Sequence, residues 1–102
     1  MAALAVCVSS TSPAAGNETI TDVEALAIVH RHCVACHAVE PTHPAFDKPP
    51  NGVKFETIAD LKSYAPRIYA QTVQNRAMPL GNQTHMTEEE RAALGRWLKA
   101  LP

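Results

Sequence analysis

Side chains first recur with helical spacing in residues 21–37. Thr21-Asp22-Val23-Glu24 is a capping box, in which the Thr21 hydroxyl and the Glu24 carboxylate each accept a hydrogen bond from an otherwise unpaired backbone amide. The positions that follow at i, i+3, i+4 and i+7 are Val23, Leu26, Ala27 and His30. The pattern predicts an amphipathic helix that buries this face and ends near residues 33–37.

Two further helical stretches lie in the second half of the chain. One opens near residues 57–60 and is interrupted at Pro66, which suits the first turn of a new helix. Its apolar stripe is Ala65, Ile68, Tyr69, Thr72 and Val73. The other begins at a second capping box, Thr87 to Glu90, whose three glutamates we interpret as a solvated first turn. Its apolar positions are Leu94, Trp97, Leu98 and Leu101, and Pro102 ends it.

The rest of the chain lacks this periodicity. Residues 41–53 contain four prolines and one glycine, which predict a rigid loop without regular structure. Residues 1–17 pass from the apolar run Ala2–Val8, far below the roughly 18 residues of a membrane-spanning helix, into small residues. We expect a flexible linker or the remnant of a membrane segment at 1–17 and one folded domain at 18–102. Without a strand or repeat signal, that domain is predicted to be an all-α bundle.

The composition provides few large side chains to fill the core of such a bundle. Only five of the 102 residues are aromatic, although 46% are apolar. A bound cofactor could supply the missing volume. Nine Lys and Arg residues against ten Asp and Glu residues give a net charge of −1 without a basic stripe. This balance argues against nucleic acid or an anionic membrane surface as a partner.

The strongest chemical signal is Cys33-Val34-Ala35-Cys36-His37. This C-x-x-C-H pattern is typical of covalent haem attachment. Positions i, i+3 and i+4 share one face of a helix, so both sulfurs and the imidazole can address one flat macrocycle. Each sulfur would bond a vinyl carbon of haem c, and His37 would ligate the iron.

The alternatives are a zinc half-site, a thioredoxin-like redox pair and two unrelated thiols. Zinc needs two more ligands at suitable spacing, and only scattered histidines remain. A thioredoxin-like site needs a βαβ context, and no alternating strand pattern precedes Cys33. The zinc and thioredoxin-like alternatives therefore fit less well than haem.

A six-coordinate haem needs a second axial ligand, for which the candidates are Met78, Met86, His43 and His85. Met78 is followed by Pro79, which ends the preceding helix and lets a loop expose the sulfur. Met86 directly precedes the Thr87 cap, a position that usually packs onto its own helix, so we assign it to the core. Met78 is the favoured ligand, and His/Met ligation would give a high potential suited to accepting electrons.

Several residues could surround the haem less directly. Pro49 and Pro50 are 12 and 13 residues beyond His37, so one of their carbonyls could accept a hydrogen bond from the second ring nitrogen, or the prolines only stiffen the loop. Tyr69 and Trp97 should pack on the haem or on the first helix, where either could also bind a propionate. His30 and His32 are interpreted as solvent-facing or haem-edge side chains without a ligand role.

Taken together, residues 20–102 resemble class I cytochromes c, with C-x-x-C-H after the first helix, a proline-rich loop, Met-Pro, and a capped terminal helix. A closer resemblance is to the C-terminal cytochrome c domain of bacterial membrane-bound urate oxidases. It rests on His37-Ala38, Pro41-Thr42-His43-Pro44, Pro49-Pro50-Asn51-Gly52-Val53, Arg67-Ile68-Tyr69 and the run from Met78 to Thr87. By this resemblance, Cys33 and Cys36 carry the thioether bonds, and His37 and Met78 are the axial ligands.

The resemblance also implies a function. In that family an integral-membrane region oxidises urate, and the tethered cytochrome passes the electrons toward the respiratory chain. We therefore expect a mono-haem electron carrier rather than a catalytic domain. Its partners would be the urate-oxidising domain of the same parent chain and a respiratory acceptor, such as a cytochrome or a terminal oxidase. Such haem attachment is completed outside the bacterial cytoplasm, so the domain would face the periplasm. The isolated domain is expected to be a monomer. Cys7 is interpreted as a free thiol, which could form intermolecular disulfides in that oxidising compartment if it is exposed.

Two other functions fit the same motif. A free-standing periplasmic cytochrome c shuttle would have a secretory leader upstream in place of membrane spans. A haem enzyme or gas sensor would keep an open distal position and a five-coordinate iron, which Met78→Ala would change little.

Overall fold

The protein is described by a computed structural model, in which residues 19–102 are placed well enough to describe; residues 1–18, with Cys7 and the predicted linker, lie outside the described part. Within 19–102, the elements in chain order are α1 (Asp22–His32), η1 (Pro50–Gly52), α2 (Ile58–Ser63), α3 (Ala65–Tyr69), η2 (Ala70–Gln74), η3 (Leu80–Asn82) and α4 (Glu88–Ala100). This part of the chain contains no strand, which confirms the all-α prediction. Among the described residues, no helix has the length and hydropathy needed to cross a membrane.

Threonine side chains begin three of the α-helices. In each, the Thr hydroxyl accepts from the backbone N–H three residues on, and the acidic side chain there accepts from the Thr N–H. The pairs are Thr21 with Glu24, Thr57 with Asp60, and Thr87 with Glu90. The first and third are the predicted capping boxes, and α3 instead has Pro66 in its first turn, as predicted.

The buried face of α1 differs from the prediction. Val23 is 77% exposed, and Ala27 and His30 are also exposed. The buried side chains are Ala25, Ile28, Val29 and His32. They have the same i, i+3, i+4, i+7 spacing but begin two residues later, about 200° around the helix. The sequence allows both faces, and packing against α4 decides between them.

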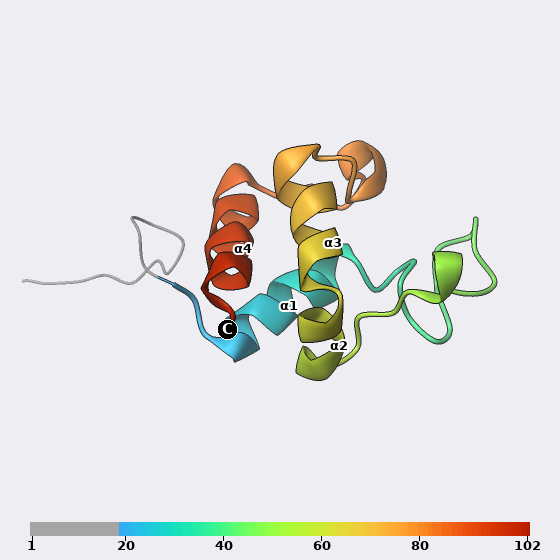
Figure 1. The fold of residues 1–102 in the computed structure, drawn as a ribbon. Helices are drawn as coiled ribbons and strands as arrows, with labels where there is room; N and C mark the ends of the chain where they lie inside the picture. The colour runs from blue at the N-terminus through green and yellow to red at the C-terminus, as the bar shows by residue number, and fades with distance from the viewer. Residues whose placement is uncertain (1–18) are drawn as a thin grey trace, which may run out of the picture.

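The core lies where α1, α3 and α4 meet. In Figure 1, α3 and α4 stand side by side, and α1 crosses behind them. From α4 come the predicted side chains Leu94, Trp97 and Leu98, all buried. The indole Nε1 of Trp97 donates to Asp22 Oδ1 at 2.9 Å, which fastens α4 to the first turn of α1.

The helix α3 continues directly into η2, a π-helical turn in which the Asn75 N–H donates to the Ala70 carbonyl at 2.9 Å. Its predicted stripe is confirmed, with Ile68 and Thr72 buried and the other members partly buried. Opposite this stripe, α4 has Gly95, where a Cβ would meet Val73 Cγ2 at 3.1 Å. This close approach brings the end of η2, and the loop after it, against α4.

The proline-rich segment leaves the helices. Residues 38–53 extend to one side of them (Figure 1). Apart from the single turn η1, residues 41–53 contain no helix, as predicted. In that turn Asn51 and Gly52 both have positive φ, 56° and 72°, so the chain reverses sharply there.

Candidate functional site

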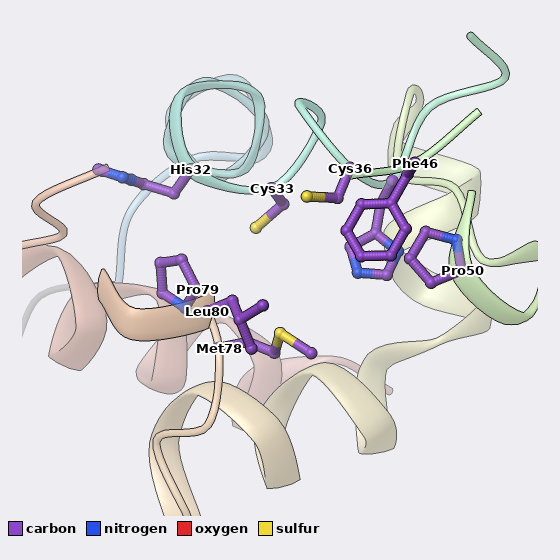
Figure 2. Close-up of a pocket in the computed structure, with 9 residues that line it drawn as sticks. His32, Cys33, Cys36, Phe46, Pro50, Met78, Pro79 and Leu80 are labelled. Carbon is purple, nitrogen blue, oxygen red and sulfur yellow. The ribbon is translucent and has the colours of Figure 1, made fainter. Parts of the chain in front are cut away.

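The C-x-x-C-H motif forms a turn at the end of α1. Cys33 caps the helix, and its carbonyl accepts from the N–H of Cys36 at 3.3 Å and of His37 at 2.9 Å. The second bond keeps the helical i to i+4 spacing, so the three side chains stay on one side of the turn. Figure 2 shows the sulfurs of Cys33 and Cys36 directed into the same cavity.

Two residues, Val53 and Phe55, fix the orientation of the His37 ring. Its Nδ1 lies 2.9 Å from the Val53 carbonyl oxygen. Because a carbonyl only accepts, Nδ1 carries the proton, and Nε2 of the neutral imidazole keeps a free lone pair. Phe55 packs against the ring with centroids 5.0 Å apart, and its N–H donates to the His37 carbonyl at 2.9 Å. Nε2 is therefore the nitrogen that could bind iron.

The prediction that Pro49 or Pro50 supplies this carbonyl is wrong. Both carbonyls are used inside the turn η1, where that of Pro49 accepts from Gly52 at 2.9 Å and that of Pro50 from Val53 at 3.0 Å. The reversal of the chain at this turn returns residue 53 to His37. The Pro50 ring lines the cavity instead.

Two adjoining pockets form a slot between His37 and Met78. One of about 50 Å³ is lined by His32, Cys33, Cys36, His37, Phe46, Pro50, Met78, Pro79 and Leu80. The other, about 230 Å³, shares His37, Pro50 and Met78 with it and reaches Val53, Phe55 and Ile68. The wall facing the cysteines is Met78, Pro79 and Leu80 (Figure 2). The slot is mainly apolar, and the predicted axial residues lie along both of its pockets.

The other predicted distal candidates lie elsewhere. Met86 is buried in the core, as predicted, and is 4% exposed. His85 is exposed, and His43 Nε2 lies 3.1 Å from Gln83 Oε1, a contact that joins the proline-rich loop to the loop after Met78. None of these three lines either pocket. Of the four candidates, Met78 is the one that shares the slot with His37.

The backbone of Met78 is held on both sides. Its N–H donates to the Gln71 carbonyl at 3.0 Å, and its carbonyl accepts from Arg91 Nη1 at 2.9 Å. Gln71 belongs to η2 and Arg91 to α4. Two helices therefore fix the residue that faces His37.

A partly buried polar cluster joins the end of α1 to α4. His32 is 7% exposed, and its ring points away from the two cysteines (Figure 2). Its Nε2 lies 2.9 Å from Glu90 Oε1, and its Nδ1 lies 2.8 Å from Thr84 Oγ1. Although burial opposes ionisation, hydrogen bonds from the Thr87 N–H, Arg31 and His32 lower the pKa of Glu90 to about 2. This cluster therefore stabilises the ionised form of the Glu90 carboxyl group.

One prediction about this region needs correction. Glu90 is not part of a merely solvated first turn, because its carboxylate bonds across to α1. Of the two alternatives for His32, the solvent-facing one is wrong, because the residue is buried and lies at the edge of the cavity with its ring turned away from the cysteines. His30 is exposed, as predicted, and its Nε2 lies 3.0 Å from the Glu56 carbonyl.

Tyr69 and Trp97 do not line the slot. Tyr69 borders a separate groove at the end of α4, where Lys99 Nζ lies 5.5 Å from its ring centroid. The Trp97 N–H is occupied by Asp22, so the prediction that this residue packs on the first helix is confirmed. The predicted propionate contact does not agree with either position.

The two thiols are poorly suited to thiol redox chemistry. Burial raises the pKa of the Cys33 thiol to about 12, and the neighbouring Cys36 adds to the rise. Burial also raises the pKa of Cys36. A thioredoxin-like pair needs an easily ionised thiol, so this alternative does not fit. Within residues 19–102, no three His, Cys, Asp or Glu side chains form a group that could hold a metal ion.

Three residues that support the slot are not predicted from the sequence. Val53 and Phe55 orient His37, and no local pattern marks them apart from their place after the turn residues Asn51 and Gly52. Arg91 has a clearer signal, since it occupies the same helical stripe as the buried Leu94 and Leu98. A charged residue on a buried stripe indicates a specific partner inside the fold.

Comparisons with protein-family models, with curated proteins and with solved structures found no match for this chain.

Proposed function

We propose that this chain is a mono-haem cytochrome c domain of the class I fold that carries single electrons. The observation that carries the proposal is the convergence of Cys33, Cys36, His37 and Met78 on one mainly apolar slot. The two sulfurs would hold the haem by thioether bonds, and His37 Nε2 and the Met78 sulfur would be the axial ligands. Bound there, the haem would supply the one-electron iron couple, which side chains do not provide.

The surroundings of the ligands support a high reduction potential. The Val53 carbonyl and the Phe55 ring fix the orientation and tautomer of His37. Mainly apolar side chains line the slot and make the surroundings of the ligand atoms less polar than water. A thioether ligand in such surroundings favours ferrous iron, so the domain would accept electrons readily.

Its electrons would come from urate that a membrane-embedded region of the same parent chain oxidises, and would pass to a respiratory acceptor on the periplasmic side. This part of the proposal rests on the sequence resemblance. Two of the runs that carry it, residues 49–53 and 78–87, contain residues from the two opposite walls of the slot. A free-standing periplasmic shuttle would use the same site. The placement of Met78 favours either carrier over a haem enzyme or gas sensor, which needs an open distal position.

Covalent haem attachment is tested by expressing the chain with a c-type maturation system. The expected product keeps its visible absorption with the polypeptide through acid and organic-solvent extraction, and its mass rises by one haem. The double variant Cys33→Ser with Cys36→Ser should lose both signals, whereas Cys7→Ser, which alters the cysteine outside the motif, should keep them. Haem that extracts freely from the unaltered protein would refute the cytochrome c proposal.

The electron donor is tested on anaerobic membranes that contain the full-length parent protein. Urate is added, and the reduced visible band of the haem is recorded against time. Rapid urate-dependent reduction is the expected result. If dithionite reduces the haem but urate does not, the carrier function stands and the urate assignment is wrong.

A further inference from the structure

Arg91 is a buried cation on α4 whose contacts go mainly to backbone. The residue is 7% exposed, and its Nη1 donates to the carbonyls of Thr72 at 2.6 Å and Met78 at 2.9 Å. The nearest carboxylate oxygen, Glu88 Oε2, is 4.0 Å from Nε, and within residues 19–102 Nε has no hydrogen-bond partner. Burying such a charge is costly unless its hydrogen bonds are specific and strong. The position of Arg91 therefore calls for a reason beyond packing.

The two carbonyls belong to segments that meet only in the folded chain. Thr72 lies in η2, where the end of the helix leaves carbonyls without helical partners. Met78 lies six residues further on, in the loop that forms the distal wall of the slot. One guanidinium nitrogen has two N–H groups, so Nη1 can serve both carbonyls at once. Arg91 thereby joins the end of η2 to the residue that faces His37.

This bond completes the restraint on residue 78. The Met78 N–H is already held by the Gln71 carbonyl, and the Arg91 bond holds the other side of the residue. With both backbone groups fixed, the Met78 side chain leaves the loop in one direction, into the slot (Figure 2). Loss of the Arg91 bond would free the carbonyl side of residue 78 and let its side chain swing out.

We propose that Arg91 is the positioning residue that keeps the Met78 sulfur directed at the haem iron. The inference rests on the proposed function, since it assigns a role to Arg91 only if Met78 is an axial ligand. It predicts that Arg91 controls how often Met78 leaves its place, and not simply how stable the fold is.

Imidazole reports this opening, because it binds the iron of the intact holoprotein only where the methionine has left. Arg91→Met removes the charge and the hydrogen bonds at similar side-chain length. Charged hydrogen bonds contribute about 1.5–3 kcal/mol, so imidazole should bind this variant at least about tenfold more tightly than the unaltered holoprotein. Arg91→Lys keeps the positive charge but loses the planar guanidinium with its several N–H donors. Its affinity for imidazole should lie between those of Arg91→Met and the unaltered holoprotein.

The matched control is Arg76→Gln. Arg76 also pairs with Glu88 and lies two residues before Met78, but its side chain is half exposed and its hydrogen bond goes to Glu88 and not to Met78. Its imidazole affinity should stay within about twofold of the original, as expected for an exposed ion pair. Helical circular dichroism against denaturant, run on every variant, separates loss of overall stability from release of the ligand.

Each outcome decides the question. If Arg91→Met is less stable but binds imidazole as the unaltered protein does, Arg91 is only structural and the inference is wrong. If Arg91→Met yields no holoprotein, Arg91→Lys carries the test, and unchanged imidazole affinity in it overturns the inference. If the unaltered oxidised protein lacks a sulfur-to-iron charge-transfer band, Met78 is not a ligand, and the proposed axial pair fails together with this inference. If the band is present and Met78→Ala abolishes it, the proposed axial pair stands whatever Arg91 does.

Discussion

The two walls of the slot are held in different ways. On the His37 side, the cysteines and the histidine lie within five residues, and the Cys33 carbonyl binds the N–H groups of Cys36 and His37 directly. On the Met78 side, the restraints come from η2 and α4, through Gln71 and Arg91. One wall is mostly local in sequence, whereas the other depends on the packing of distant helices.

This difference has a physical consequence. A turn that bonds to itself loses little when distant parts of the chain move, because its contacts have short sequence separation. A loop held by two helices loosens whenever either helix shifts. We therefore expect changes in the helical core to release Met78 before they release His37.

The largest effects should separate two methionines that are eight residues apart. Met86→Ala removes a core side chain and should lower the free energy of unfolding by about 2–5 kcal/mol, because it leaves a cavity. Met78→Ala should cost less stability, since the residue borders the slot, but should abolish the sulfur-to-iron charge-transfer band and lower the potential.

Denaturant titration and the absorption spectrum of the oxidised protein distinguish the two variants. Retention of the band in Met78→Ala would rule out this residue as the distal ligand. A similar loss of stability in both variants would show that the two methionines play the same packing role.

Acid should weaken the link between the walls through Glu90. The pKa of this carboxyl falls from 4.5 to about 2 in the fold, so the unfolded chain takes up the proton first as the pH drops. The ionised Glu90 carboxylate contributes fully to the unfolding free energy above about pH 4.5, and this contribution is lost as the pH falls toward 2. Its upper limit is about 3 kcal/mol. Glu90→Gln should flatten the curve of unfolding free energy in this window, and Glu89→Gln, which changes an exposed neighbour, should not. Parallel curves for the unaltered protein and Glu90→Gln would contradict this role.

A smaller effect is expected on the His37 wall. Phe55→Leu removes the ring that packs 5.0 Å from the His37 ring but keeps an apolar side chain at the site. The unfolding free energy should fall by about 2 kcal/mol, because the ring is lost from aromatic contacts with both His37 and Tyr64, each contributing about 1 kcal/mol. The charge-transfer band should persist in the absence of denaturant, because the hydrogen bonds that hold Met78 to Gln71 and Arg91 are unchanged. Loss of the band in Phe55→Leu would show that Phe55 also restrains Met78, contrary to the assignment of that restraint to Gln71 and Arg91.

The same contrast explains how much could be predicted from the sequence. The capping boxes at Thr21 and Thr87 and the motif at residues 33–37 are local, so spacing alone placed them correctly. Spacing alone predicts the wrong face of α1, because two stripes of equal spacing exist and only packing against α4 selects one. Likewise, the carbonyl that binds His37 depends on the backbone path through Asn51 and Gly52, which no side-chain pattern specifies.

The smallest effect should come from Arg76, although it lies closest to Met78 in sequence among the arginines. Its partner Glu88 is 74% exposed, so water screens the pair and its side chains lose entropy when they meet. Arg76→Gln should change the unfolding free energy by no more than about 0.5 kcal/mol. The denaturant concentration at which half of the charge-transfer band is lost, the midpoint of ligand release, should stay the same. Arg91, only 7% exposed, is predicted to shift that midpoint downward when replaced. If Arg76→Gln moved the midpoint as far as Arg91→Met does, surface charge rather than buried hydrogen bonding would hold the distal wall, and the contrast between the two walls would lose its physical basis.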